Sequence, residues 1–151
     1  MKSMKGIVSV IALALAVGAA ACGGAGKVAA DPFAEPDTAL REVVAYLDRG
    51  DTDRMWATMA REHQARCPYD RFNALWEEQG GLGRVRVKSV DEVREVGAWE
   101  GFEDVTAVTY TYELAVGDEK TEVADTMHLA RQGGLYRWVM TPPKLAACEG
   151  T

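Results

Sequence analysis

Histidine, the side chain that most often binds metals or transfers protons near neutral pH, is scarce in this chain. The 151 residues include two histidines, His63 and His128. Neither occurs in an HExxH pattern or beside carboxylates at metal-ligand spacing. We therefore expect no metal site, and we expect both histidines to lie at the surface or at a helix end.

The chain also lacks the loops that carry phosphate binding and nucleophilic catalysis. The glycine-rich stretch Gly80-Gly81-Leu82-Gly83 follows a predicted helix, whereas phosphate-binding loops lie between a strand and a helix. No serine occupies a nucleophile elbow, the strained turn between a strand and a helix that exposes a reactive hydroxyl. The sequence thus predicts neither a cofactor nor a covalent catalytic centre.

The chain also has fewer positively charged than negatively charged residues. The 17 Lys and Arg residues face 23 Asp and Glu residues, which gives a formal net charge of −6. Because phosphate backbones are repelled by such a protein on average, we expect no nucleic-acid partner. The composition, 48% hydrophobic and 26% charged, is that of an ordinary globular protein, and the length has room for one domain.

No apolar run reaches the roughly 20 residues that a membrane-spanning helix needs. Residues 6–21 are uncharged and mostly apolar, follow a short positive region with Lys2 and Lys5, and end in Ala19-Ala20-Ala21. This order is typical of a secretory signal with a small-residue cleavage site. We therefore predict a removable leader at residues 1–21, whose loss leaves 15 Lys and Arg against 23 Asp and Glu, a net charge of −8.

Cys22 follows the leader directly and precedes Gly23-Gly24. At this point the chain resembles the lipobox of bacterial lipoproteins, in which the cysteine thiol takes a diacylglycerol before the leader is removed. The resemblance implies a lipid anchor at Cys22 and a location on the extracytoplasmic side of the cell membrane, while ordinary cleavage after Ala21 is the alternative. Residues 22–36, rich in Gly, Ala and Pro, would form a flexible stalk.

An odd cysteine count is informative in an exported protein. If Cys22 is acylated, Cys67 and Cys148 are left as a pair. A bridge between them would close a loop of about 80 residues and stabilise the fold by roughly 4 kcal/mol in the chain-entropy model. The alternative is two separate buried thiols.

Helical patterns fill the first half of the folded region. Asp37 is placed as an N-cap, and Gly50 as the end, of a helix whose apolar residues recur at three- and four-residue spacing. A second helix is predicted from Asp51 to about Gln64. A third begins at Pro68 and stops at the glycines that follow residue 79. Trp56 and Trp76 lie on the apolar faces of these helices, where core positions are expected.

After Gly83 the apolar positions alternate, which predicts strands. We expect a first strand that continues past a bulge to about Gly97, and further strands at 108–116, 121–131 and 135–141. Gly117-Asp118 and Gly133-Gly134 are hairpin turns, so the sheet is antiparallel. Pro142-Pro143 would end the last strand. The predicted fold is an α+β domain over residues 37–148, with three helices packed on a curved, cone-like sheet of four or more strands.

This order of helices and strands resembles the nuclear transport factor 2-like superfamily, also called the SnoaL or ketosteroid-isomerase-like fold. The residues that carry the resemblance are 44–51, Trp56, 63–68, Phe72, Trp76 and the run of strands. The resemblance implies a cone that encloses an apolar cavity. Members of the superfamily often form homodimers through the open sheet face, so the resemblance also implies a homodimer. Fold does not decide function in this superfamily.

Asp125 is the candidate acid or base. On the strand 121–131 it shares a side with Val123, Met127 and Leu129, so we expect apolar neighbours that desolvate its carboxylate. Tyr110 and Tyr112, inward on the preceding strand, could donate to a developing oxyanion. The alternative is that Asp125 lies in water or accepts a backbone hydrogen bond.

A different candidate is the aromatic pair Trp99 and Phe102, which flanks a glycine-containing turn. Exposed on that turn, the two rings would form a contact with a partner protein. Packed back onto the sheet, they would be part of the core.

These observations favour a membrane-anchored lipoprotein whose domain binds an envelope protein or a small apolar ligand without catalysis. Two alternatives stay open. One is an isomerase- or cyclase-like enzyme that uses Asp125, and the other is an accessory domain in envelope complex assembly with the Trp99–Phe102 turn as its contact.

The lipid anchor is tested on the mature N-terminus. We expect mass spectrometry to find a lipid-modified Cys22 as the first residue, and Cys22→Ala to remove the lipid mass and release the protein from the membrane fraction. Gly26→Ala, in the same segment, is the control and stays bound to the membrane. A Cys22→Ala protein that stays in the membrane fraction would refute the lipidation site.

Overall fold

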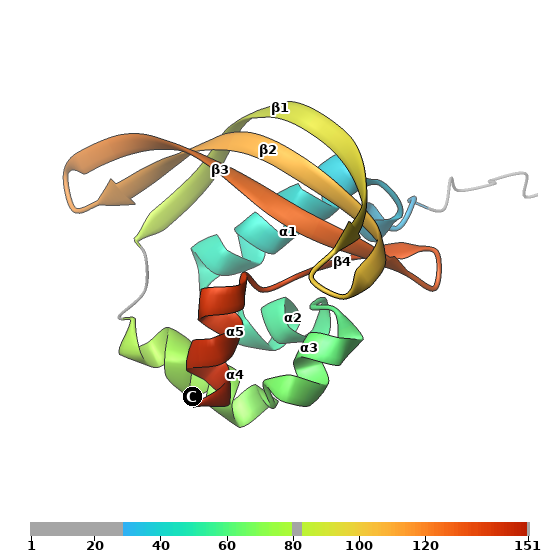
Figure 1. The fold of residues 1–151 in the computed structure, drawn as a ribbon. Helices are drawn as coiled ribbons and strands as arrows, with labels where there is room; N and C mark the ends of the chain where they lie inside the picture. Colours follow the sequence, from blue (N-terminus) through green and yellow to red (C-terminus); the bar gives the residue numbers. More distant parts are fainter. Residues whose placement is uncertain (1–28, 80–82, 151) are drawn as a thin grey trace, which may run out of the picture.

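The computed structural model describes residues 29–79 and 83–150. The predicted leader and Cys22 lie outside the described residues, as does most of the Gly80-Gly81-Leu82-Gly83 stretch. Figure 1 shows a four-stranded sheet that arches over α1, with the shorter helices gathered beyond α1 on the same side of the sheet. The elements in chain order are η1 (Pro32–Ala34), α1 (Pro36–Arg49), α2 (Thr52–Ala57), α3 (Arg61–Arg66), α4 (Tyr69–Glu78), β1 (Arg84–Trp99), β2 (Phe102–Val116), β3 (Glu119–Gln132), β4 (Leu135–Trp138) and α5 (Pro142–Glu149).

The helix α1 begins with Pro36 rather than after an Asp37 cap. Its N-cap is Glu35, which makes no side-chain capping hydrogen bond, and Asp37 lies in the first turn. Proline fits this first position because its missing N–H has no helical partner there, and an acidic residue in the first turn favours the helix dipole. Gly50 ends the helix in the left-handed conformation at φ 65°, as a glycine readily does.

Residues just before α1 also contact the domain. In the last part of the stretch predicted to be a stalk, η1 brings the Phe33 ring to 6.5 Å from the Tyr46 ring on α1. Thr38 also donates its hydroxyl to the Pro32 carbonyl at 2.5 Å.

The helix expected from Asp51 to Gln64 is two helices, α2 and α3, with a break at residues 58–60. The Thr58 hydroxyl donates to the Arg54 carbonyl and closes the end of α2. Met59 then forms a parallel bridge with Trp138, and the Ala60 amide donates to the Trp138 carbonyl at 2.9 Å. The prediction of one helix was wrong because these partners lie far away in the sequence.

The C-terminal segment also differs from the prediction. The last strand ends at Trp138 instead of 141, and Pro142-Pro143 begin the helix α5 instead of merely ending a strand. Proline is compatible with the first turn of a helix, where its ring and fixed φ cost nothing. Leu145 and Cys148 form the buried side of α5.

The sheet is an antiparallel meander in the order β1-β2-β3-β4. Four register shifts interrupt the pairing of β1 with β2, between Val87 and Trp99. Bulges increase local twist, so they account for the arch of the long strands and for the irregular apolar spacing in residues 89–97. The prediction of a first strand continuing past a bulge, and of an α+β fold with a curved antiparallel sheet, is confirmed.

The core lies between α1 and the concave face of the sheet. Leu40 and Val43 on α1 pack into one buried cluster with Val108 on β2 and Leu129 on β3. Met59 and Phe72 are fully buried in the same cluster. Among residues 29–79 and 83–150, no helix has the length and apolar character needed to cross a bilayer.

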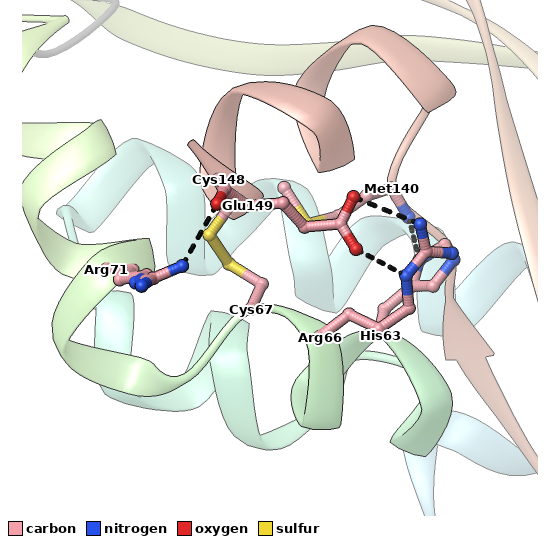
Figure 2. A network of polar contacts seen from close by, with 7 residues as sticks. All are labelled: His63, Arg66, Cys67, Arg71, Met140, Cys148 and Glu149. Carbon is pink, nitrogen blue, oxygen red and sulfur yellow. Dashed lines mark hydrogen bonds and ion pairs between the residues drawn. A yellow bond between two sulfur atoms is a disulfide. The ribbon is translucent and has the colours of Figure 1, made fainter. Parts of the chain in front are cut away.

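A disulfide joins Cys67 to Cys148, with a Cα–Cα distance of 5.6 Å, as predicted for this pair. Figure 2 shows the bridge between the end of α3 and the end of α5. Next to it the Arg66 guanidinium donates to both carboxylate oxygens of Glu149, at 2.6 and 3.1 Å, and Arg71 donates to the Glu149 carbonyl. The C-terminal helix is thus held to the other helices by a covalent bond and by ionic contacts.

We expect Cys148→Ser to lower the free energy of unfolding by about 2–4 kcal/mol, because the unfolded chain regains the entropy of an 81-residue loop. In thermal unfolding this is a fall in Tm of roughly 10–20 °C. Ala147→Ser, an exposed neighbour on α5, is the matched control and should unfold near the wild-type temperature. Equal melting temperatures for Cys148→Ser and the wild type would contradict a stabilising bridge.

Candidate functional site

A cavity of about 130 Å³ opens between the concave face of the sheet and the helices α1, α4 and α5. Its floor is apolar, and polar atoms from β2, β3 and α5 reach its walls. The lining residues are Val43, Val44, Leu47, Met55, Trp76, Val85, Tyr110, Tyr112, Asp125, Thr126, Met127, His128, Trp138, Val139, Met140, Thr141 and Lys144. We call this cavity the sheet pocket.

The pairing of β2 with β3 brings the three candidate residues together in the sheet pocket. Tyr110 lies opposite Asp125, and Tyr112 lies opposite Val123, so all point from the concave face. The two tyrosine rings are 5.7 Å apart between centroids with an interplanar angle of 29°. The sheet pocket therefore has an aromatic wall with a carboxylate beside it.

Tyr110 is 6% exposed, and no hydrogen bond to its hydroxyl is found in the part of the chain that the structure describes. Burial, and then the negative charge of Asp125, raise the pKa of Tyr110 above its ordinary value. The same two causes raise the pKa of Tyr112. Both phenols are therefore neutral near pH 7 and can donate a hydrogen bond to a bound molecule.

Asp125 is not surrounded by apolar side chains as expected. It points from the concave face, but its side chain is exposed at the mouth of the sheet pocket, and one carboxylate oxygen accepts the Thr126 amide at 2.8 Å. The expectation of a desolvated carboxylate is thus corrected, because the long strands β2 and β3 carry this position past the cover that the helices provide.

Two lining residues were missed as site residues. Trp76 was assigned to the core, yet its indole Nε1 is buried without a hydrogen-bond partner among the described residues. Lys144 lies on the unpredicted helix α5, with its Nζ 5.8 Å from the centroid of the Trp76 ring. The Pro142-Pro143 pair was the available signal for α5, since proline is frequent at the first helical position.

Comparisons with known proteins identify the fold. No protein-family model matches the sequence, and no curated protein matches it. A similar solved structure is that of an NTF-2 like protein of unknown function from Shewanella oneidensis MR-1, with a TM-score of 0.50 and 12% sequence identity. The match covers 68% of this chain and 89% of that chain. The folded region has the nuclear transport factor 2-like fold. At this identity the similarity shows the fold alone.

His63 lies in the last turn of α3, a helix end as expected, but its side chain is buried. It is 3% exposed, its Nδ1 accepts the Met140 amide at 3.1 Å, and its ring meets the Phe102 ring edge-on at 5.1 Å. Burial, followed by the charge of Arg66, lowers the pKa of His63. The neutral ring therefore accepts the hydrogen bond of the Met140 amide, which would otherwise be buried without a partner.

The aromatic pair on the β1–β2 turn packs back onto the domain. Phe102 is 8% exposed against His63, and Trp99 stacks on His128 at 3.9 Å between centroids with an interplanar angle of 3°. Glu100 in the turn has a positive φ of 47°, followed by Gly101 at 87°, as the tight hairpin requires. The two rings therefore pack onto the sheet, which was the alternative to an exposed partner contact.

The described part of the chain offers no cluster of metal ligands. In residues 29–79 and 83–150, no group of three or more His, Cys, Asp or Glu side chains is placed to hold a metal ion.

The burial of His63 predicts a pH-dependent stability. Its folded-state pKa lies below the unfolded value of about 6.5, so the unfolded chain binds more protons, and stability is complete above pH 6.5 and falls as the pH drops through 6 and 5. We expect His63→Asn, which keeps an acceptor for the Met140 amide, to flatten this decline in urea midpoints measured at pH 7, 6 and 5.

His128→Asn is the companion variant, since burial also lowers the pKa of His128. Each single variant should reduce, but not abolish, the decrease in the urea midpoint between pH 7 and pH 5. A slope unchanged in His63→Asn would show that His63 titrates alike in the folded and unfolded states.

Proposed function

We propose that this chain is an exported lipoprotein, anchored through Cys22 on the extracytoplasmic side of the cell membrane. Its nuclear transport factor 2-like domain binds a small, mostly apolar ligand in the sheet pocket and performs no catalysis. The observation that carries the ligand-binding proposal is the sheet pocket itself, with an apolar floor and a few convergent polar groups.

The size of the sheet pocket supports a small ligand. Its 130 Å³ is close to the roughly 150 Å³ of an engineered apolar cavity that holds benzene. Buried side chains of α1 and α2, Val43, Val44 and Met55, form much of the floor. A single ring with a short polar arm would fill this space and reach the hydroxyls at the wall.

The lipid anchor is supported by the cysteine arrangement. The disulfide uses Cys67 and Cys148, so Cys22 is the remaining thiol of the three. A free thiol is a liability in an oxidising compartment, whereas an acylated one is not. Together with the leader sequence, this supports lipidation over simple cleavage after Ala21.

An isomerase- or cyclase-like activity has one observation in its favour, which is that Asp125, Tyr110 and Tyr112 line the same pocket. A general base of this kind is tuned by desolvation, and the exposed carboxylate of Asp125 lacks that environment. A role as an accessory domain in envelope complexes would have used Trp99 and Phe102, which pack onto the domain instead. Ligand binding accounts for the sheet pocket more directly.

The proposal is tested with benzyl alcohol as a neutral probe. We expect it to bind in about the millimolar range, seen as saturable NMR shifts of residues that line the sheet pocket, because a ligand of this size gains little beyond apolar burial. Met127→Trp, which adds a ring inside the sheet pocket, should weaken binding at least tenfold.

Thr121→Trp is the matched control, since it introduces the same ring on β3 at an exposed position away from the sheet pocket, and it should bind as the wild type does. Val85→Phe fills the sheet pocket from β1 and keeps the test decisive if Met127→Trp is poorly folded. Shifts spread over the whole surface, without saturation, would rule out the pocket as a binding site.

A further inference from the structure

The mouth of the sheet pocket carries a negative charge with spare hydrogen-bonding capacity. One Asp125 oxygen accepts the Thr126 amide, and no ion pair to Asp125 is found in residues 29–79 and 83–150. The Asp125 charge is close enough to act on both Tyr110 and Tyr112. A carboxylate at a pocket mouth attracts cations and repels anions.

The wall next to this carboxylate is aromatic. The Tyr110 and Tyr112 rings lie side by side on β2, and an aromatic face attracts a cation through its quadrupole. Tyr110 is 6% exposed, and its hydroxyl has no hydrogen-bond partner among the described residues. Its oxygen can therefore accept a hydrogen bond from a bound molecule. A carboxylate, an open hydroxyl and aromatic faces together match an ammonium group.

The chain already places one ammonium of its own against the aromatic lining. Lys144 Nζ lies 5.8 Å from the centroid of the Trp76 ring, on the α4 and α5 side of the sheet pocket. This contact occupies a different ring from the tyrosine pair beside Asp125. Lys144 is exposed to solvent, and its contact leaves the tyrosine wall for a ligand.

We propose that the ligand of the sheet pocket is a small organic cation, an ammonium group on an apolar or aromatic body. The ammonium lies against the Asp125 carboxylate and the Tyr110 and Tyr112 rings, and the apolar body fills the floor formed by α1 and α2. This inference rests on the proposed ligand-binding function and adds the charge and chemical class of the ligand.

Three probes of nearly equal shape separate the possibilities: benzylammonium, benzyl alcohol and benzoate. We expect benzylammonium to bind about tenfold more tightly than benzyl alcohol, and benzoate more weakly than either, in NMR titrations at pH 7 and low salt. The preference for benzylammonium should shrink as the salt concentration rises, because the mouth is exposed and screened.

Asp125→Asn should remove the preference for benzylammonium over benzyl alcohol, because the amide carries no charge. Asp118→Asn, in the β2–β3 turn and outside the sheet pocket, makes the same change in net charge and should keep the preference. If benzyl alcohol binds but benzylammonium has no advantage, or if Asp125→Asn keeps the advantage, the cation proposal is overturned and ligand binding stands. If none of the three probes binds, both proposals fail.

Discussion

The side chain and backbone of Trp138 hold the helical layer against the sheet. Its indole Nε1 donates to the Met55 carbonyl at 2.7 Å, its carbonyl accepts the Ala60 amide, and its ring lies 6.1 Å from the Phe72 ring on α4. One residue at the end of the short strand β4 therefore contacts α2, the α2–α3 break and α4. Because buried polar groups are costly unless paired, these hydrogen bonds fix where the helices can lie. The same indole forms a wall of the sheet pocket, so the pocket exists where this junction leaves space.

The C-terminal helix reinforces that junction from the other side. The chain leaves Trp138, passes Met140, whose amide is held by His63, and turns into α5, which the disulfide and the Arg66–Glu149 pair hold to α3. Figure 2 shows these contacts close together, between α3 and the C-terminal segment. The exposed ion pair adds little to the free energy of unfolding. The disulfide stabilises the fold more, because it lowers the entropy of the unfolded chain. Lys144, at the sheet pocket, is positioned by the same helix.

The features that local sequence determines were predictable. Helical spacing, glycine turns and strand alternation gave the element order and the antiparallel sheet, and the odd cysteine count indicated the Cys67–Cys148 pair. Three of the errors share one cause. The break at residues 58–60, the early end of β4, and the burial of His63 all depend on partners about 80 residues away, such as Trp138 and Met140. A local pattern carries no information about such partners, so tertiary contacts override it.

The exposure of Asp125 follows from a mismatch of lengths. The strands β2 and β3 are 15 and 14 residues long, and Figure 1 shows their hairpin extending past the end of α1. The part of the concave face near this hairpin has no helix over it, which also leaves Val116 60% exposed. A carboxylate costs little free energy there, whereas deeper on the same face, next to Leu129, it would need a buried partner. The sheet pocket can therefore combine an apolar floor formed by α1 and α2 with a charged mouth on β3, and the ligand proposed for it has an apolar body and a charged end.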